Sequence, residues 1–290
     1  AIGVPQCGSP NPAATTPMKT LALAMIARNE ERCLERCLRS AEPFVDRLIV
    51  LDTGSTDRTI EIAKDCGAEV FERRWTDDFA AARNAVLSRS RADYNLILDA
   101  DEWIESGGEH IAALREQRQP KVYLLRVRST LQSHTSDIQS FNWMMRLLPK
   151  GVRYRGRVHE QPQHRLPTER LDVTLGHDGY TPQLLRAKRG RNRSLLLQQL
   201  AENPDDSYVL YQLGKDDDVY TGAASAVEYY WKALELANPR APYRHDLIMR
   251  LLVCLPMIGQ TDKALMLAAD EMPKWQNSAD FHYLAAEVMF

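Results

Sequence analysis

Short apolar runs alternate with segments of helical spacing over the first hundred residues of the chain. Strands are predicted at residues 21–27, 47–52, 69–72 and 94–98. Helices are predicted between them, at 30–41, from Ser55 or Thr56 to Cys66, and at 77–90. This alternation indicates a parallel sheet with helices on both faces. Ligands of such sheets bind outside the carboxyl ends of the strands, which nominates the loops 28–31, 52–57, 75–83 and 99–103.

The pattern changes after residue 120. Residues 122–128, 141–148 and 153–159 are strand-like, and Pro149-Lys150-Gly151 supplies a turn between the last two. We expect these strands to extend the sheet in antiparallel fashion. The polar segment 129–140 is either a loop that closes over a ligand or a plain surface loop.

A helical period follows Gly179. Residues 203–236 form a block with the length of a tetratricopeptide repeat. The residues that match the repeat's spacing are Leu213, Gly214, Ala226, Tyr230 and Ala233. A looser second block begins at Tyr243, and a third helix begins near Ala279. Arrays of such repeats form concave surfaces that hold extended peptides or pair two copies of a chain. We therefore expect a peptide partner or a homodimer through these helices.

The chain has 290 residues, of which 44% are hydrophobic and 26% are charged. This composition suits a globular protein of about two domains and excludes a disordered chain, a collagen-like repeat and a disulfide scaffold. No apolar run approaches the ~18–20 residues that crossing a bilayer takes, so we expect no transmembrane segment. The five cysteines include no pair at zinc-binding spacing, which favours a reducing, cytoplasmic compartment.

The net charge of −2 conceals an uneven distribution. Residues 121–200 carry 15 basic and five acidic side chains, a net charge of +10, and both flanking parts are acidic. The basic part indicates either an anionic ligand or a basic surface packed against acidic neighbours. No nucleic acid partner is predicted.

An acidic motif, Asp99-Ala100-Asp101-Glu102, follows the fourth predicted strand. On an extended segment, carboxylates two residues apart project to the same side. Oxygen ligands with open positions suit Mg²⁺ or Mn²⁺ shared with a diphosphate. The alternative is an acidic helix N-terminus that interacts with the helix dipole. The position of the motif, at the end of a strand in an α/β sheet, favours the metal site.

A second motif, Asp52-Thr53-Gly54-Ser55-Thr56-Asp57, follows the second predicted strand. Its carboxylate and hydroxyls can hold a base or ribose by hydrogen bonds, or form an ordinary turn before a capped helix. The first turn lacks GxGxxG and GxxxxGK[ST], which argues against a dinucleotide dehydrogenase and a P-loop NTPase.

Four segments together resemble the family 2 glycosyltransferases of the GT-A fold. They are AMIARNEERCLERCLRSA, LIVLDTGSTDRTIEIA, DDFAAARNAVLSRSRADYNLILDADEW and RYRGRVHEQP. The next stretch, HDGYTPQLLRAKRGRNRSLLLQQLAENPDD with the repeat, resembles the subgroup that carries C-terminal tetratricopeptide helices. The bacterial peptide S-glycosyltransferases that modify glycocins lie near that subgroup. The resemblance implies a GT-A (Rossmann-like) α/β domain followed by an all-α domain.

The resemblance also implies roles for individual residues. A divalent cation, Mn²⁺ or Mg²⁺, would be held by Asp99, Asp101 and His177. A nucleotide-diphosphate sugar, with UDP as the expected nucleotide, would be bound by Ala27, Arg28, Glu30, Asp52, Arg83, Asp99 and Ala100. Many relatives have two consecutive acids where this chain has Asp52-Thr53, so the chain departs from the family there. The candidates for the catalytic base are Glu160 first, His159 second, and Glu102 or Asp101 third.

These features predict a metal-dependent, inverting glycosyltransferase that acts on a Cys, Ser or Thr side chain of a peptide or protein. Two alternatives stay open: transfer to a lipopolysaccharide or other glycan, which the basic segment 121–200 supports, and a scaffold with a degenerate transferase domain. The expected parts are a tail at 1–17, a GT-A domain at 18–181, a connecting helix at 182–202, and a tetratricopeptide-like domain at 203–290 that stops within a repeat.

Overall fold

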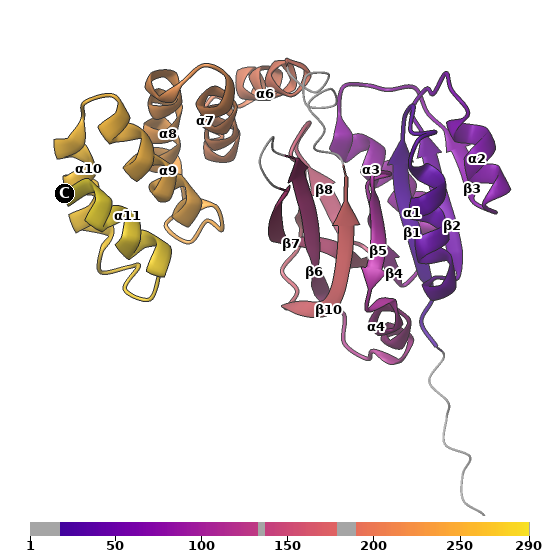
Figure 1. Cartoon of the computed structure of the whole chain (residues 1–290). Coiled ribbons are helices and arrows are strands. Elements are labelled where there is room, and N and C mark those ends of the chain that lie inside the picture. The colour runs from indigo at the N-terminus through magenta and orange to yellow at the C-terminus, as the bar shows by residue number, and fades with distance from the viewer. Residues whose placement is uncertain (1–17, 133–136, 179–189, 290) are drawn as a thin grey trace, which may run out of the picture. The chain divides into compact units, whose positions relative to one another are not determined.

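The computed structural model describes residues 18–132, 137–178 and 190–289 (Figure 1). The predicted tail at 1–17 and residues 182–189 of the predicted connecting helix lie outside this part of the chain. Contacts divide the chain into two compact units. Of the described residues, the first contains 18–73, 85–132, 137–152 and 164–178, and the second contains 74–84, 153–163 and 190–289.

The first unit is built on a sheet that has eight strands in the described residues. In spatial order they are β3 (Glu69–Glu72), β2 (Arg47–Asp52), β1 (Leu21–Ala27), β4 (Tyr94–Leu96), β7 (Asp137–Pro149), β6 (Val122–Gln132), β10 (Thr168–His177) and β5 (Glu102–Ser106). The first four are parallel to one another. β7 runs antiparallel to both β4 and β6. This arrangement confirms the predicted α/β fold of the GT-A type.

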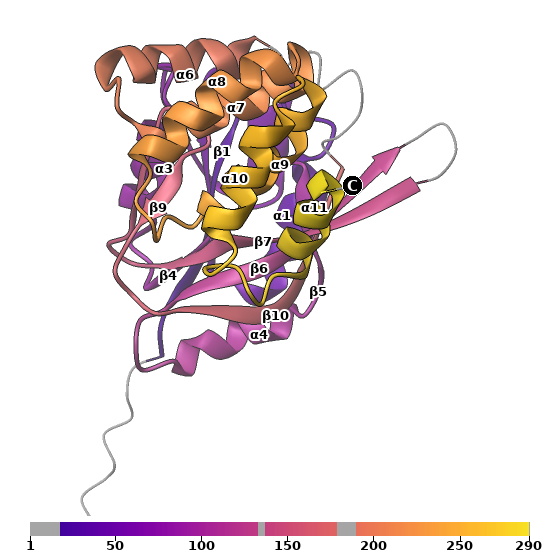
Figure 2. The ribbon, with the colours of Figure 1, turned by 90° about the vertical axis from the view of Figure 1, so that its left-hand side faces the viewer.

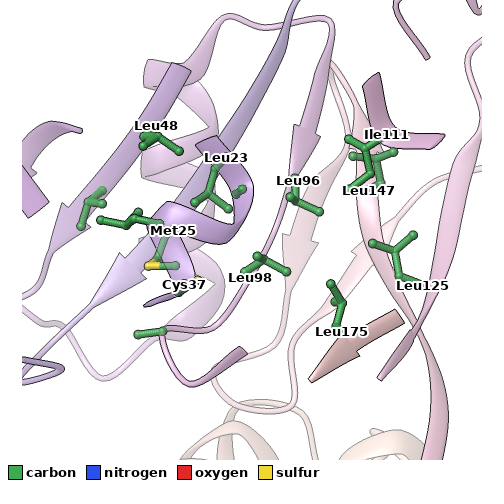
Figure 3. Close-up of a cluster of buried hydrophobic side chains, with 14 of the residues drawn as sticks. Leu23, Met25, Cys37, Leu48, Leu96, Leu98, Ile111, Leu125, Leu147 and Leu175 are labelled. Carbon is green, nitrogen blue, oxygen red and sulfur yellow. The ribbon is translucent and has the colours of Figure 1, made fainter. Parts of the chain in front are cut away.

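Helices cover the sheet because their apolar residues share one face. The helices between the strands are α1 (Leu34–Ala41), α2 (Thr59–Asp65), α3 (Phe79–Ser90) and α4 (Gly108–Ala113), with short 3₁₀ turns η1 (Glu42–Phe44) and η2 (Leu114–Glu116). In α1, Leu34, Cys37, Leu38 and Ala41 follow helical spacing and are buried. They pack in the core shown in Figure 3 with residues of the strands, among them Met25, Leu96 and Leu125.

The second half of the sheet differs from the prediction in three ways. The segment 129–140, predicted as a loop, instead continues β6 and β7 as an antiparallel hairpin around the undescribed residues 133–136. β10, at residues where no strand was predicted, pairs in parallel with β6, although only antiparallel pairing was expected. The edge strand β5, which begins within the acidic motif, is antiparallel to β10 and was not predicted. β5 carries only five residues, too few for a clear alternation in the sequence.

The second unit is mainly helical. Its helices after residue 190 are α6 (Arg191–Glu202), α7 (Ser207–Tyr220), α8 (Ala223–Leu236), α9 (Arg244–Met257), α10 (Thr261–Glu271) and α11 (Ala279–Met289). Figure 2 shows α7 to α11 as neighbouring helices, and α7 and α8 fill the predicted block 203–236. A two-stranded ribbon, β8 (Arg153–Arg155) with β9 (Gln161–Gln163), belongs to the same unit. None of the helices in the described residues is long and apolar enough to cross a membrane.

Gly214 permits the close approach of α7 to α8. A Cβ atom at this position would lie 2.4 Å from two ring atoms of Tyr230, whose side chain is fully buried. We expect Gly214→Ala to lower the free energy of unfolding by about 1–3 kcal/mol, because the buried ring has no space to move into. Urea denaturation measures this change. Lys232→Ala, on the exposed side of α8, is the control and should stay within about 0.5 kcal/mol of the unaltered chain. Equal stability of the two variants would contradict the packing argument.

Candidate active site

The acidic motif forms a turn, and an arginine from another strand binds two of its carboxylates. Arg146 of β7 donates from Nη2 to Asp99 Oδ2 at 2.9 Å and to Glu102 Oε1 at 2.5 Å. Glu102 Oε2 in turn accepts the backbone N–H of Asp99 at 3.0 Å. Arg146 and Glu102 are buried, whereas the Asp99 side chain is 40% exposed. The Asp99 side chain therefore reaches solvent, while the buried ion pair of Arg146 and Glu102 fixes the turn that carries it.

Burial raises the pKa of Glu102, and the neighbouring charge of Asp99 raises it further, while Arg146 opposes both effects. A buried carboxylate of this kind is stable only with a cation beside it. Arg146 was not among the residues predicted for the site. A signal was present, because Arg146 is the only charged residue in the apolar run from Trp143 to Pro149. A charge within such a strand needs a buried partner.

Asp101 has a different partner from Asp99. His177, at the end of β10, lies with Nε2 3.4 Å from Asp101 Oδ2, and its Nδ1 lies 3.1 Å from the hydroxyl of Ser129 on β6. Burial alone would lower the pKa of His177, but the hydrogen bond and charge of Asp101 outweigh it and raise that pKa. Both side chains are about 15% exposed. The structure thus brings Asp101 and His177 together, although 76 residues separate them in the sequence.

The chemistry of these side chains fits a divalent cation that a diphosphate shares. Within the described residues, no three His, Cys, Asp or Glu side chains gather to form a complete metal site. Mg²⁺ commonly takes one or two carboxylates from the protein and its remaining ligands from substrate phosphates and water. The partly exposed Asp99 and the Asp101–His177 pair supply oxygen and nitrogen ligands of this kind. Their role as metal ligands stays a prediction.

The loops after β1 and β2 are joined by hydrogen bonds. Asn29 adopts a left-handed φ of 55°, and its side-chain oxygen accepts the backbone N–H of Thr56 at 2.8 Å. Ser55 Oγ accepts the N–H of Asn29 at 2.9 Å, and Thr59 Oγ1 accepts that of Glu30 at 2.8 Å. These bonds explain why α1 and α2 begin later than predicted: the residues before each helix form the joined loops.

The predicted nucleotide-binding residues of this unit lie at the ends of these strands. Ala27 ends β1, and its carbonyl accepts the N–H of Thr53 at 2.9 Å. Asp52 is buried, and its carboxylate accepts the N–H groups of Gly54 and Ser55 at 2.9 Å and the Ser55 hydroxyl. Arg28 is exposed, Glu30 is half-buried and accepts a hydrogen bond from Cys33, and Ala100 is buried in the acidic turn. Binding of a nucleotide by these residues stays a prediction.

The other predicted site residues belong to the second unit. Arg83 donates from Nε to Glu160 Oε1 at 2.5 Å, with side-chain exposures of 7% and 12%. The Asn84 side chain makes two hydrogen bonds with the backbone of Tyr154: it donates to the carbonyl at 2.9 Å and accepts the N–H at 2.8 Å. The start of α3 thereby holds the β8–β9 ribbon.

His159 lies in the turn of this ribbon with a left-handed φ of 52°. Its carbonyl accepts hydrogen bonds from the Tyr208 hydroxyl and from Gln161 Nε2, both at 3.2 Å. The neighbouring Val158 packs with Leu195 of α6 and other residues of the helices. Although His159 is exposed at the surface, desolvation by the protein around it and the nearby Lys215 ammonium lower its pKa, which favours the neutral imidazole. A neutral imidazole near pH 7 can accept a proton, as a general base must.

Comparison with known proteins identifies the sheet-containing part of the chain. Residues 23–147 match the model of glycosyl transferase family 2. A TPR repeat-containing protein of Synechococcus elongatus is 33% identical over 264 residues, which cover 86% of this chain and 64% of that protein. The SPbeta prophage-derived glycosyltransferase SunS of Bacillus subtilis is 26% identical over 254 residues, or 84% of this chain and 60% of SunS.

The chain therefore spans 64% and 60% of the length of these two relatives. A crystal structure of glucosyl-3-phosphoglycerate synthase from Mycobacterium tuberculosis aligns over 37% of this chain and 44% of its own, with 27% identity and a TM-score of 0.31. The family match and both relatives agree with the resemblance found in the sequence. Residues 23–147 are thus similar to the family 2 glycosyltransferases, and the helical region follows them in the same chain.

Proposed function

We propose that the protein transfers a sugar from a UDP-sugar to a side chain of a peptide or protein with the help of Mn²⁺ or Mg²⁺. The observation that carries this proposal is the meeting of His177 with Asp101 beside Asp99, since both aspartates lie in the part of the chain that matches glycosyl transferase family 2. A bound cation would offset the charge that develops on the leaving diphosphate. Asp99, Asp101 and His177 are the residues that would hold it.

The reaction follows from the chemistry of the donor. The acceptor oxygen or sulfur forms a bond to the anomeric carbon as the bond from that carbon to the diphosphate breaks, and UDP leaves. A single in-line displacement inverts the configuration at this carbon. The joined loops at 28–31 and 52–57 would orient the nucleotide, and Arg83 remains a candidate to bind it. A positioned base takes the acceptor proton.

The peptide acceptor is supported by the helix pairs α7/α8 and α9/α10, because stacked helix pairs of this kind offer extended surfaces for peptides. A homodimer through the same helices is the other use of such a surface. A glycan acceptor is the second candidate, supported by the net charge of +10 in residues 121–200. Mass spectrometry of the product separates the two acceptors: sugar on a peptide supports the first, and sugar confined to a glycolipid supports the second.

UDP release from a panel of UDP-sugars tests the transferase proposal. We expect release in the presence of Mn²⁺ or Mg²⁺, loss of release with EDTA, and recovery when excess Mn²⁺ is added. Release that EDTA leaves unchanged would reject the metal. No release from any donor, with water or with candidate peptides and glycans as acceptors, would favour the scaffold alternative.

We propose His159 as the catalytic base. Glu160, the first candidate from the sequence, has its Oε1 engaged by Arg83. The lowered pKa of His159 favours its neutral imidazole. With Mn²⁺ in saturating excess, so that His177 stays bound to the metal, kcat/KM for donor hydrolysis should fall only below the ordinary histidine pKa of about 6.5. His159→Gln should remove this acidic limb and slow hydrolysis by about 100-fold. The pH profile of kcat/KM measures both effects.

Glu160→Gln is the matched variant, because it changes the neighbouring residue of the same turn. We expect Glu160→Gln to keep the acidic limb. A limb that persists in His159→Gln and disappears in Glu160→Gln would assign the base to Glu160 instead.

A further inference from the structure

Two arginines of α1 and the adjoining turn hold the residue that follows His177. Arg36 donates from Nη2 to Asp178 Oδ2 at 2.5 Å. Arg32 donates from Nη1 to Oδ2 at 3.2 Å and from Nη2 to Oδ1 at 3.1 Å. We call this group, Arg32, Arg36 and Asp178, the Asp178 clasp. Both oxygens of the Asp178 carboxylate are engaged by guanidinium groups.

The clasp lies where β10 reaches the acidic turn. The backbone N–H of Asp178 donates to the carbonyl of Asp101 at 3.3 Å. The next residue back, His177, has one ring nitrogen against Asp101 and the other against Ser129. A displacement of Asp178 would therefore move His177 relative to Asp101.

A second contact fixes the same strand end. Trp103 of β5 pairs with Gly176 of β10, and a Cβ atom on Gly176 would lie 2.3 Å from the Trp103 ring. The guanidinium carbon of Arg36 lies 3.7 Å from the centroid of that ring. Arg36 thus binds Asp178 with its nitrogens and covers Trp103 with its flat face. This geometry uses the planar guanidinium in two ways that a lysine cannot reproduce.

The clasp is poorly placed to stabilise the fold. The exposed fractions of the Arg32, Arg36 and Asp178 side chains are 53%, 44% and 32%. Ion pairs this exposed contribute little to the free energy of unfolding. Their geometric effect, which is to fix the end of β10, does not depend on that energy.

We infer that Arg32, Arg36 and Asp178 are positioning residues that hold His177 at Asp101 for the divalent cation. This inference rests on the proposed function, in which Asp101 and His177 are metal ligands. Groups that orient a metal ligand typically change metal affinity by about 10- to 100-fold when they are removed. The clasp would act on the cation through His177, without contacting it.

Titration with Mn²⁺ alone, with free Mn²⁺ measured by electron paramagnetic resonance, tests the inference. The principal variant is Arg32→Met/Arg36→Met. It removes two positive charges near the site, so charge alone would make Mn²⁺ bind more tightly. Loss of positioning predicts the opposite: about tenfold weaker binding or more. Asp178→Asn should weaken Mn²⁺ binding as well. Arg36→Lys keeps the charge but not the planar group, and its Mn²⁺ affinity should lie between those of the unaltered chain and the double arginine variant.

Two controls separate positioning from other effects. Glu169 lies on β10 with His177 but near the other end of that strand, and its carboxylate pairs with Lys121. Glu169→Gln removes this ion pair and should leave Mn²⁺ affinity unchanged. In a His177→Ala background, the double arginine variant should cause no further loss, because residues that act through one group are not additive. Retained thermal stability of the variants excludes unfolding as the cause.

Three results would overturn the inference. Equal or tighter Mn²⁺ binding by the double arginine variant would reject positioning and leave the proposed transferase intact. An equal loss in the His177→Ala background would show that the arginines act independently of His177. If the unaltered chain bound no Mn²⁺, the metal part of the proposed function would fail together with this inference.

Discussion

Asp101→Asn is expected to lower the rate of metal-dependent UDP release by about 100- to 1,000-fold, the usual effect of losing one preorganised electrostatic contact to the transition state. Asparagine keeps the size of the side chain and an oxygen that can face His177. It removes the negative charge that a divalent cation needs. The loss should therefore appear in catalysis and in Mn²⁺ affinity, with little change in stability.

Asp172→Asn is the control for Asp101→Asn. Asp172 lies on β10 of the same unit and is exposed, so its substitution changes the net charge equally without touching the acidic turn. We expect its rate of UDP release to match that of the unaltered chain. Full activity of Asp101→Asn would remove Asp101 from the proposed metal site.

Arg146→Met is expected to lower the free energy of unfolding by about 3–5 kcal/mol, the range found when one partner of a buried ion pair is removed. Methionine fills much of the space but leaves Glu102 buried without its cation. Urea denaturation measures the change. The double variant Arg146→Met/Glu102→Gln should recover part of the loss, because a neutral amide does not need a buried cation.

The loss of unfolding free energy in Arg146→Met should depend on pH. Burial and Asp99 already raise the pKa of Glu102, and loss of the Arg146 cation raises it further. A carboxyl group whose pKa is higher in the folded chain binds protons preferentially there, so lowering the pH toward its folded pKa stabilises the folded state. The stability difference from the unaltered chain should therefore shrink as the pH falls.

Arg128→Met is the matched control for Arg146→Met. Arg128 lies on the neighbouring strand β6, and its partner Glu105 is partly exposed at 35%. We expect a loss of at most about 1 kcal/mol, as for other exposed ion pairs. Equal losses of unfolding free energy in the two variants would show that the buried Arg146–Glu102 pair stabilises the fold no more than an exposed ion pair does.

Much of the fold was predictable because its signals are local. The apolar runs at Leu21–Ala27 and Arg47–Asp52 became β1 and β2 with the predicted bounds. The block 203–236 became the pair α7 and α8, with Ala226, Tyr230 and Ala233 buried as the repeat pattern requires. Periodicity shows which residues are buried within one element. It gave no indication of β5, or of the parallel pairing of β10 with β6, because pairing depends on distant segments.

The candidate site, too, was predictable only in part. The sequence pattern pointed to Asp99 and Asp101 at a strand end, and the family resemblance added His177 to the same metal site. Neither indicated the side chains that support these residues. Arg146 supports the acidic turn from 44 residues away, and Asp178 lies beside Arg32 although 146 residues separate them. The ribbon that carries His159 and Glu160 groups with the helices, where the sequence suggested a continuation of the sheet.

Residue type and spacing thus specify the elements, their buried faces and the chemical character of the strand ends, because these depend on neighbours a few positions away. The partners of Glu102, His177 and Asp178 depend on how the strands and α1 pack. Hydrogen bonds and ion pairs act over about 3 Å. Chain segments reach that separation only when the whole sheet has formed, so only the folded chain shows those contacts.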